Sequence, residues 1–140
     1  MEYKIYGDTV AIRLDKGDEI TESVKKVAEL EKISCGTVTG IGATDDFTVG
    51  VFDVKKAEYE TKRYNGNHEI NAIIGNVTEK DKNPYIHLHI TCTGKDGKVV
   101  GGHLICGKIS LTGEIFLQKI SGKITRFYDP DLKINRIKPE

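Results

Sequence analysis

The chain has 140 residues, and its 21 lysine and arginine residues balance its 21 aspartate and glutamate residues. A chain of this length buries about two-thirds of its unfolded surface, so it can fold without a disulfide or a structural metal. The balanced charge gives no general attraction to phosphate backbones or anionic lipids. No long apolar run and no basic-then-apolar leader is present, so we expect a cytoplasmic protein without a membrane partner. The odd count of three cysteines predicts free thiols.

The first elements predicted along the chain are two short strands and one helix. The strands cover 3–6 and 9–15 and are separated by Gly7-Asp8. Asp18 is the expected N-cap, and the helix is expected to end near Ile33-Ser34. Its apolar stripe follows a spacing of three and four residues and consists of Ile20, Val24, Val27 and Ala28, with Leu30 as a further candidate.

The remainder of the chain predicts strands separated by turns. Strands are expected over 36–44, 47–54, 58–64, 68–78, 85–93, 98–110 and 113–120. Turns are expected at Asn65-Gly66-Asn67, before Pro84, and at Lys95-Asp96-Gly97. This order favours one α+β domain over 1–140, with a largely antiparallel sheet, a core over about 17–120 and a C-terminal tail over 121–140. The pair Gly101-Gly102 within a strand indicates a bulge or the close approach of another backbone.

Three of the four histidines lie on two neighbouring predicted strands. His87 and His89 are two residues apart and therefore point to the same face of the sheet. A two-residue loop at Asp96-Gly97 would place His103 on the other face. A three-residue loop at 95–97 would place His103 directly opposite His89, and Gly97 suits the left-handed position in which such a loop ends. We prefer the three-residue loop, although a bulge at Gly101-Gly102 would shift the register by one.

With that register, His87, His89 and His103 are candidate ligands of one divalent metal ion. Three imidazoles on adjacent strands can close on an ion and leave a coordination position open. The ligand set is compatible with Zn, Ni, Fe, Mn or Cu. The alternative interpretation is a hydrogen-bonded histidine cluster without metal. The same alternation places Cys92 and Cys106 on the opposite, apolar face, as core residues.

Two further residues are weaker candidates for the site. His68 lies at the expected start of a neighbouring strand, and Glu69 is the nearest candidate for a carboxylate ligand or general base. A solvated carboxylate at a strand end is the alternative for Glu69. Gly40-Ile41-Gly42-Ala43 lacks the third glycine of a dinucleotide-binding loop and favours tight strand packing instead.

Several motifs together resemble the PPC (plant and prokaryote conserved) domain, which occurs alone in bacteria and archaea and beside AT-hooks in plant nuclear proteins. In chain order they are Gly40-Ile41-Gly42-Ala43, Gly50-Val51-Phe52-Asp53, Glu69-Ile70, Gly75-Asn76-Val77, Pro84-Tyr85-Ile86-His87-Leu88-His89 and Gly101-Gly102-His103-Leu104. The resemblance covers about residues 17–120. It implies an α+β fold that assembles as a trimer, with a metal in some stand-alone members at the positions of His87, His89 and His103.

The resemblance leaves three functional hypotheses. The first is a homotrimeric metal-binding protein that holds one divalent ion, zinc above the others, in each subunit near a subunit boundary. The second is a DNA-binding or protein-interaction module with structural histidines, although the AT-hook core Arg-Gly-Arg-Pro is absent from this sequence. The third is a hydrolase-like enzyme in which a metal-bound water reacts and Glu69 is the base.

Overall fold

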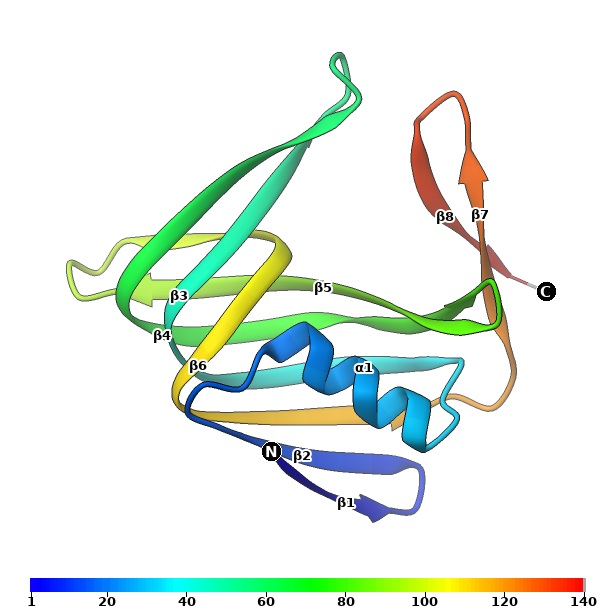
Figure 1. The fold of residues 1–140 in the computed structure, drawn as a ribbon, viewed down its shortest axis with the longest axis horizontal. Helices are drawn as coiled ribbons and strands as arrows, with labels where there is room; N and C mark the ends of the chain where they lie inside the picture. The colour runs from blue at the N-terminus through cyan, green and yellow to red at the C-terminus, as the bar shows by residue number, and fades with distance from the viewer. Residues whose placement is uncertain (140) are drawn as a thin grey trace.

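The computed structural model describes residues 1–139, and over these residues the chain forms one helix and eight β-strands (Figure 1). The sheet is antiparallel apart from one parallel pairing, so the expected α+β class with a largely antiparallel sheet is confirmed. No helix within 1–139 has the length and apolar character needed to cross a membrane. The elements are β1 (Glu2–Tyr6), β2 (Thr9–Asp15), α1 (Ile20–Leu30), β3 (Gly36–Asp53), β4 (Glu58–Lys80), β5 (Asn83–Gly94), β6 (Val99–Lys119), β7 (Ile124–Asp129) and β8 (Ile134–Pro139).

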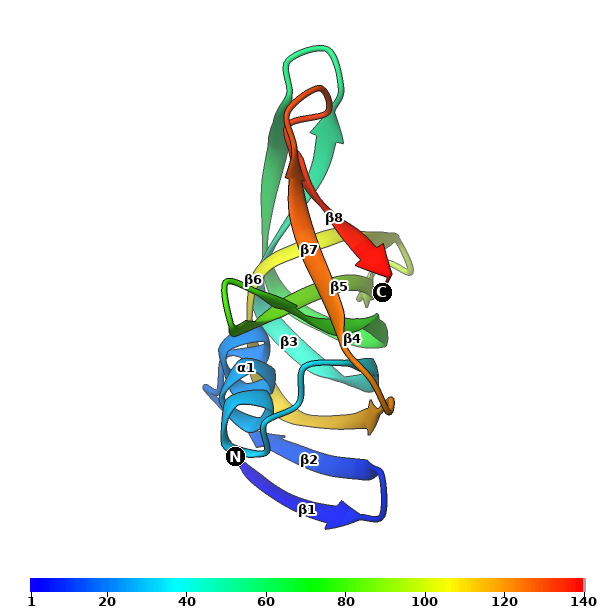
Figure 2. The ribbon, with the colours of Figure 1, turned by 90° about the vertical axis from the view of Figure 1, so that its right-hand side faces the viewer.

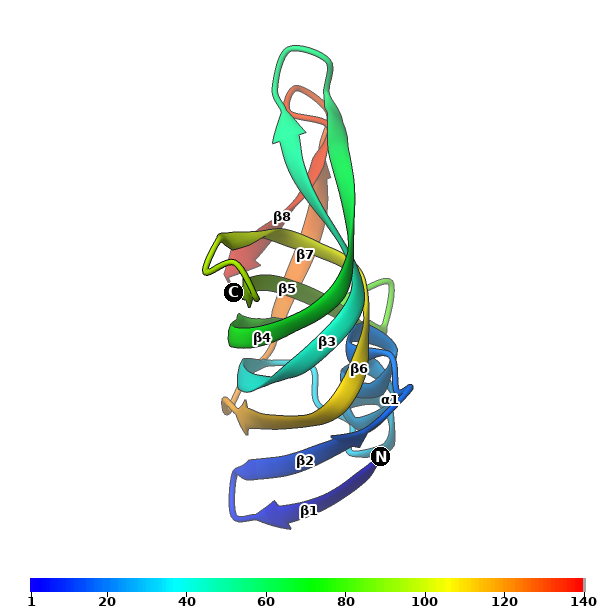
Figure 3. The same ribbon diagram turned by 90° about the vertical axis from the view of Figure 1, so that its left-hand side faces the viewer.

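Four long strands close on one another and form the centre of the molecule. β3 pairs with both β4 and β6, and β5 pairs with the same two strands from the other side. β6 achieves this by pairing first with β5 and then, from His103 onward, with β3. Figure 3 shows how β6 curves between its pairing with β5 and its pairing with β3.

Helix α1 covers one face of the sheet, and four side chains of the predicted apolar stripe are buried: Ile20, Val24, Val27 and Ala28. Leu30, the further candidate, is 58% exposed at the last residue of the helix. The N-cap is Glu19 and not Asp18, because the Asp18 carboxylate binds the N-terminal ammonium and the amide of Asp15. The Glu19 carboxylate accepts hydrogen bonds from the amides of Glu22 and Gly107. The helix ends at Leu30, earlier than expected, because Lys32 adopts a left-handed conformation (φ 52°).

Two pairs of expected strands are in fact continuous. β3 runs through the expected break near residue 45, and β4 runs through Asn65-Gly66-Asn67, which was expected to be a turn. A register shift between the pairs Thr44–His68 and Asp46–Asn65 absorbs the extra β4 residue as a bulge. Gly66, with φ of 90°, takes the positive-φ conformation within this segment.

The segment that was expected to be a tail after residue 120 folds into the β7–β8 hairpin. β7 contacts the end of β4 through a parallel pairing of Glu79 with Thr125. The turn is closed by Asp129, whose carboxylate accepts from two turn amides and from the Arg136 guanidinium. This hairpin and the tip of the β3–β4 hairpin rise on the same side of the molecule (Figure 2).

The prediction for the two strand cysteines was right for one and wrong for the other. Cys92 is fully buried in the core, whereas Cys106 is exposed. The cause is a register shift in β6, where Thr48 pairs with Cys106 but Val49 pairs with Leu104. The extra residue, Ile105, reverses the alternation from that point, so Cys106 no longer points into the core.

Replacement of Gly75 by alanine is expected to destabilise the fold, because a Cβ at this position would collide with the carbonyl oxygen of His87 on β5. Backbone atoms cannot give way as a flexible side chain can, so we expect a loss of about 2–3 kcal/mol, measured by urea unfolding. Gly94→Ala is the matched control, because its Cβ would meet only side-chain atoms of Asp96 and His68. Equal stability of the two variants would contradict this account of the β4–β5 contact.

Candidate metal centre and adjoining pocket

The three-residue loop fixes the register between β5 and β6, as the sequence predicts. His89 pairs with His103, and the pairing continues without a shift to Thr93 and Val99. Gly97 adopts φ of 74°, and its amide donates to the carbonyl of Gly94. Since directly opposed residues share a face, His103 joins His87 and His89.

Gly101 and Gly102 permit a close backbone approach and do not form a bulge against β5. A Cβ on Gly101 would collide with the carbonyl oxygen of Ile90, and one on Gly102 would lie 2.9 Å from the carbonyl oxygen of Gly50. The two glycines therefore let β6 pass from β5 to β3 immediately before His103. The second of the two sequence interpretations, close approach, is the one observed.

The three imidazoles form a compact cluster. Ring centroids are 5.2 Å apart for His87 and His89, 5.0 Å for His87 and His103, and 5.5 Å for His89 and His103. One ring nitrogen from each lies within 4.8 Å of the other two. Nδ1 of His103 is buried and has no hydrogen-bond partner among the described residues. A buried imidazole nitrogen without a partner, in a cluster of three imidazoles, fits a metal ion that the side chains close around.

The surroundings of the cluster favour neutral imidazoles. Burial lowers the pKa of His87 to about 4, and the neighbouring His103, the Arg126 guanidinium and His89 act in the same direction. Burial, followed by the proximity of His89, also lowers the pKa of His103. A neutral imidazole is the form that ligates a metal, so these two side chains are in the binding state at neutral pH.

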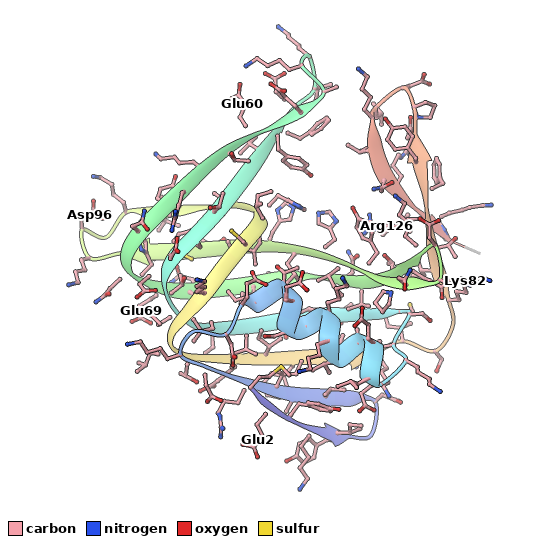
Figure 4. All side chains as sticks on the ribbon, viewed as in Figure 1. Glu2, Glu60, Glu69, Lys82, Asp96 and Arg126 are labelled. Carbon is pink, nitrogen blue, oxygen red and sulfur yellow. The ribbon has the colours of Figure 1, made fainter. Side chains whose placement is uncertain are left out.

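Arg126, which the sequence reasoning did not identify, reaches the cluster from β7 (Figure 4). Its guanidinium donates to Oγ1 of Thr78, Oδ1 of Asn76 and the carbonyl of Asn135, and Nη2 lies 3.5 Å from Nδ1 of His87. It also lies 4.5 Å from the ring centroid of Tyr85. The β-branched and aromatic residues of 124–128 are the only local signal, and they indicate a strand without indicating where that strand docks.

A pocket of about 370 Å³ opens beside the cluster, between the β3–β4 hairpin and the β7–β8 hairpin. The Tyr59 ring stacks on His103 with centroids 4.8 Å apart and forms part of the wall. The lining residues are Phe52, Ala57, Glu58, Tyr59, Tyr85, His87, His103, Arg126, Lys133, Ile134 and Asn135.

The two weaker candidates lie elsewhere. His68 packs edge-on against Phe47, and its Nδ1 lies 2.6 Å from the carbonyl oxygen of Gly66. Glu69 is exposed, pairs with Thr93, and lies on the opposite side of the view from Arg126 (Figure 4). Within one chain, neither side chain belongs to the three-histidine cluster or lines the pocket.

The family model of the Plants and Prokaryotes Conserved (PCC) domain, the PPC domain above, matches residues 1–121. No curated protein sequence matches the chain. Residues 124–139, which form the β7–β8 hairpin, lie beyond the family match.

Three solved structures are similar over nearly their whole length. A "putative DNA-binding protein" from Bacteroides thetaiotaomicron has 29% identity and a TM-score of 0.95, covering 98% of this chain and 96% of its own. A metal-containing protein from Archaeoglobus fulgidus has 31% identity and a TM-score of 0.85, covering 95% and 94%. A plant- and prokaryote-conserved protein from Pyrococcus horikoshii has 32% identity and a TM-score of 0.85, covering 95% and 93%.

Asn76→Ala is expected to loosen the β7–β8 hairpin, because it leaves a half-buried donor of Arg126 without its acceptor. The free energy of local opening should fall by about 1–2 kcal/mol, seen as faster hydrogen exchange of the amides of 124–139. Asn71→Ala is the control, since Asn71 lies on the same strand and accepts only an exposed hydrogen bond from Thr93. Unchanged exchange in the Asn76 variant would contradict the role of Arg126 as the contact that holds the hairpin.

Proposed function

Because the chain belongs to the Plants and Prokaryotes Conserved domain family, we propose that it is a metal-binding protein in which His87, His89 and His103 ligate one divalent ion. The observation that carries the proposal is the convergence of three ring nitrogens within 4.8 Å. The buried, unpartnered Nδ1 of His103 and the depressed histidine pKa values support it. The relative from Archaeoglobus fulgidus, named as metal-containing, gives independent support.

Zinc is the metal that this donor set fits best in our proposal. Zinc accepts three imidazole nitrogens and a fourth, exchangeable ligand without a preferred d-electron geometry. No cysteine belongs to the cluster among the described residues, and nitrogen donors alone do not exclude nickel, iron, manganese or copper. A bound ion would supply a Lewis-acidic position that faces the pocket.

His89→Ala is expected to abolish stoichiometric metal, because two imidazoles cannot hold a divalent ion as three do. The measurement is elemental analysis of protein purified without an affinity tag, with wild type expected to hold one ion per chain. His68→Gln is the matched control, since it removes the one histidine outside the cluster. Full metal content in the His89 variant would overturn the proposal.

We also propose that the protein is a homotrimer with the metal near the subunit boundary. The sheet face that carries His89 is apolar and open beside it: Ile74, which pairs with His89, is 61% exposed. Phe116 is 51% exposed in the same row, with Thr39 between them. Apolar surface of this kind marks an interaction site, and His89 is the exposed member of the cluster.

The trimer predicts a solution mass of three chains, each of 15.5 kDa, by light scattering coupled to size exclusion. Ile74→Lys should reduce the mass toward that of one chain, because it places charge in the apolar row. Leu30→Lys is the control, since Leu30 is similarly exposed but lies at the end of α1. A single-chain mass for wild type would contradict the trimer.

DNA binding is the second candidate, and it rests on the names of the relatives from Bacteroides thetaiotaomicron and Ralstonia eutropha. The equal numbers of basic and acidic residues give the chain no net attraction to a phosphate backbone. Duplex binding at low salt with a steep salt dependence is the observation that would favour this candidate over metal binding alone.

A further inference from the structure

We propose that the pocket beside the three histidines binds a small organic carboxylate, with one carboxylate oxygen on the metal ion and the other on the guanidinium of Arg126. The inference rests on the proposed metal site and adds the chemical class of its ligand. The residue that carries it, Arg126, lies beyond the segment that the family model matches.

Among residues 1–139, Arg126 differs from the other three arginines in having no acidic partner. Arg13 pairs with Asp15 at 3.0 Å, Arg63 with Asp46 at 2.7 Å, and Arg136 with Asp129 at 2.7 Å. The protein acceptors of Arg126 are neutral oxygens from Thr78, Asn76 and Asn135. Among residues 1–139 no carboxylate forms an ion pair with it, although it is half-buried. Together with the contact of Nη2 to Nδ1 of His87, these hydrogen bonds leave one of the five guanidinium N–H groups, on Nη1, available.

The position of this cation requires an anion once the metal is bound. Nη2 of Arg126 lies 3.5 Å from Nδ1 of His87, so guanidinium and ion would share one half-buried site. Neutral imidazoles compensate none of the ion's charge, and two adjacent cations in a partly desolvated site repel strongly. Lys133 adds a further cation to the lining, and Glu58 is the single acidic residue there. An anionic ligand that contacts both ion and guanidinium removes this repulsion.

The walls of the pocket favour an organic carboxylate over inorganic phosphate. Phe52, Tyr59 and Ile134 give the pocket apolar surface for the body of the ligand, and a volume of about 370 Å³ suits a small molecule. Phosphate sites commonly use the amides of a helix N-terminus. Helix α1, however, packs in one core with Leu88 and Ile90, which alternate with His87 and His89 on β5 and therefore point to the opposite face. A carboxylate has two oxygens on one carbon, so one oxygen can reach the ion while the other accepts a charge-assisted hydrogen bond from the guanidinium.

The test is calorimetric titration of the zinc-loaded protein with glycolate, a 2-hydroxycarboxylate, and separately with inorganic phosphate. Wild type should bind glycolate more tightly than phosphate. Arg126→Gln should weaken glycolate binding by about tenfold or more while elemental analysis still gives one zinc per chain. Arg126→Lys keeps the positive charge but loses the planar guanidinium, so its affinity for glycolate should lie between those of wild type and Arg126→Gln. Lys138→Gln on β8, outside the pocket, should match wild type.

The outcomes separate this proposal from the metal site itself. Retained zinc with unchanged glycolate affinity in both Arg126 variants overturns the carboxylate site, as does tighter binding of phosphate than of glycolate. Near-ultraviolet circular dichroism of the protein's tyrosines shows whether Arg126→Gln disturbs the hairpin. If it does, the glycolate affinity of Arg126→Lys compared with that of wild type decides whether the carboxylate site exists. If wild type binds no zinc, the metal proposal fails. The same titration of metal-free protein then decides: glycolate binding that depends on Arg126 supports the anion site, and no binding overturns it.

Discussion

The passage of β6 from β5 to β3 is the constraint on which the rest of the structure depends. β6 pairs with β5 up to His103 and with β3 from His103 onward, and its C-terminal half pairs with β2 as well. Gly101 and Gly102 make this possible because any side chain there would meet the backbone of β5 or β3. The change of partner closes the four central strands on one another and places His103 beside the two histidines of β5. The site is therefore a consequence of how the sheet closes.

A second constraint is the desolvation of positive charge around the cluster. Burial, the neighbouring His103 and the Arg126 cation disfavour the imidazolium form of His87, so its imidazole is neutral, which is the form that a metal ion requires of a ligand. The same arginine attaches the β7–β8 hairpin to the sheet through neutral acceptors on β4. One side chain thus contributes to the electrostatics of the cluster, the docking of the hairpin and the wall of the pocket.

The parts of the structure that the sequence predicts are those governed by local rules. Period-two alternation places His87 and His89 on one face, and the chemistry of Lys95-Asp96-Gly97 selects the register that adds His103. The single helix and its buried stripe also follow from local periodicity. Each of these signals lies within a window of a few residues, where steric and turn preferences decide the outcome.

The parts that the sequence does not predict depend on contacts between distant residues. The extra residue in β6 that exposes Cys106 becomes visible only in its pairing with β3, and local alternation gives no sign of it. The hairpin after residue 123 is stabilised by Asn76 and Thr78, about fifty positions earlier in the chain. Arg126 was missed for the same reason. Its importance lies in the distant acceptors that it reaches and, among residues 1–139, in its lack of the acidic partner that the other three arginines have.

The two ends of the histidine cluster face different environments, and this links the proposals. His89 is exposed beside the apolar row of Ile74, whereas His87 and His103 are half-buried and line the pocket. An ion held by all three would touch both the surface proposed for subunit assembly and the cavity proposed for the carboxylate. Ligand binding and assembly would then share one set of bonds, so either one would stabilise the other through the metal.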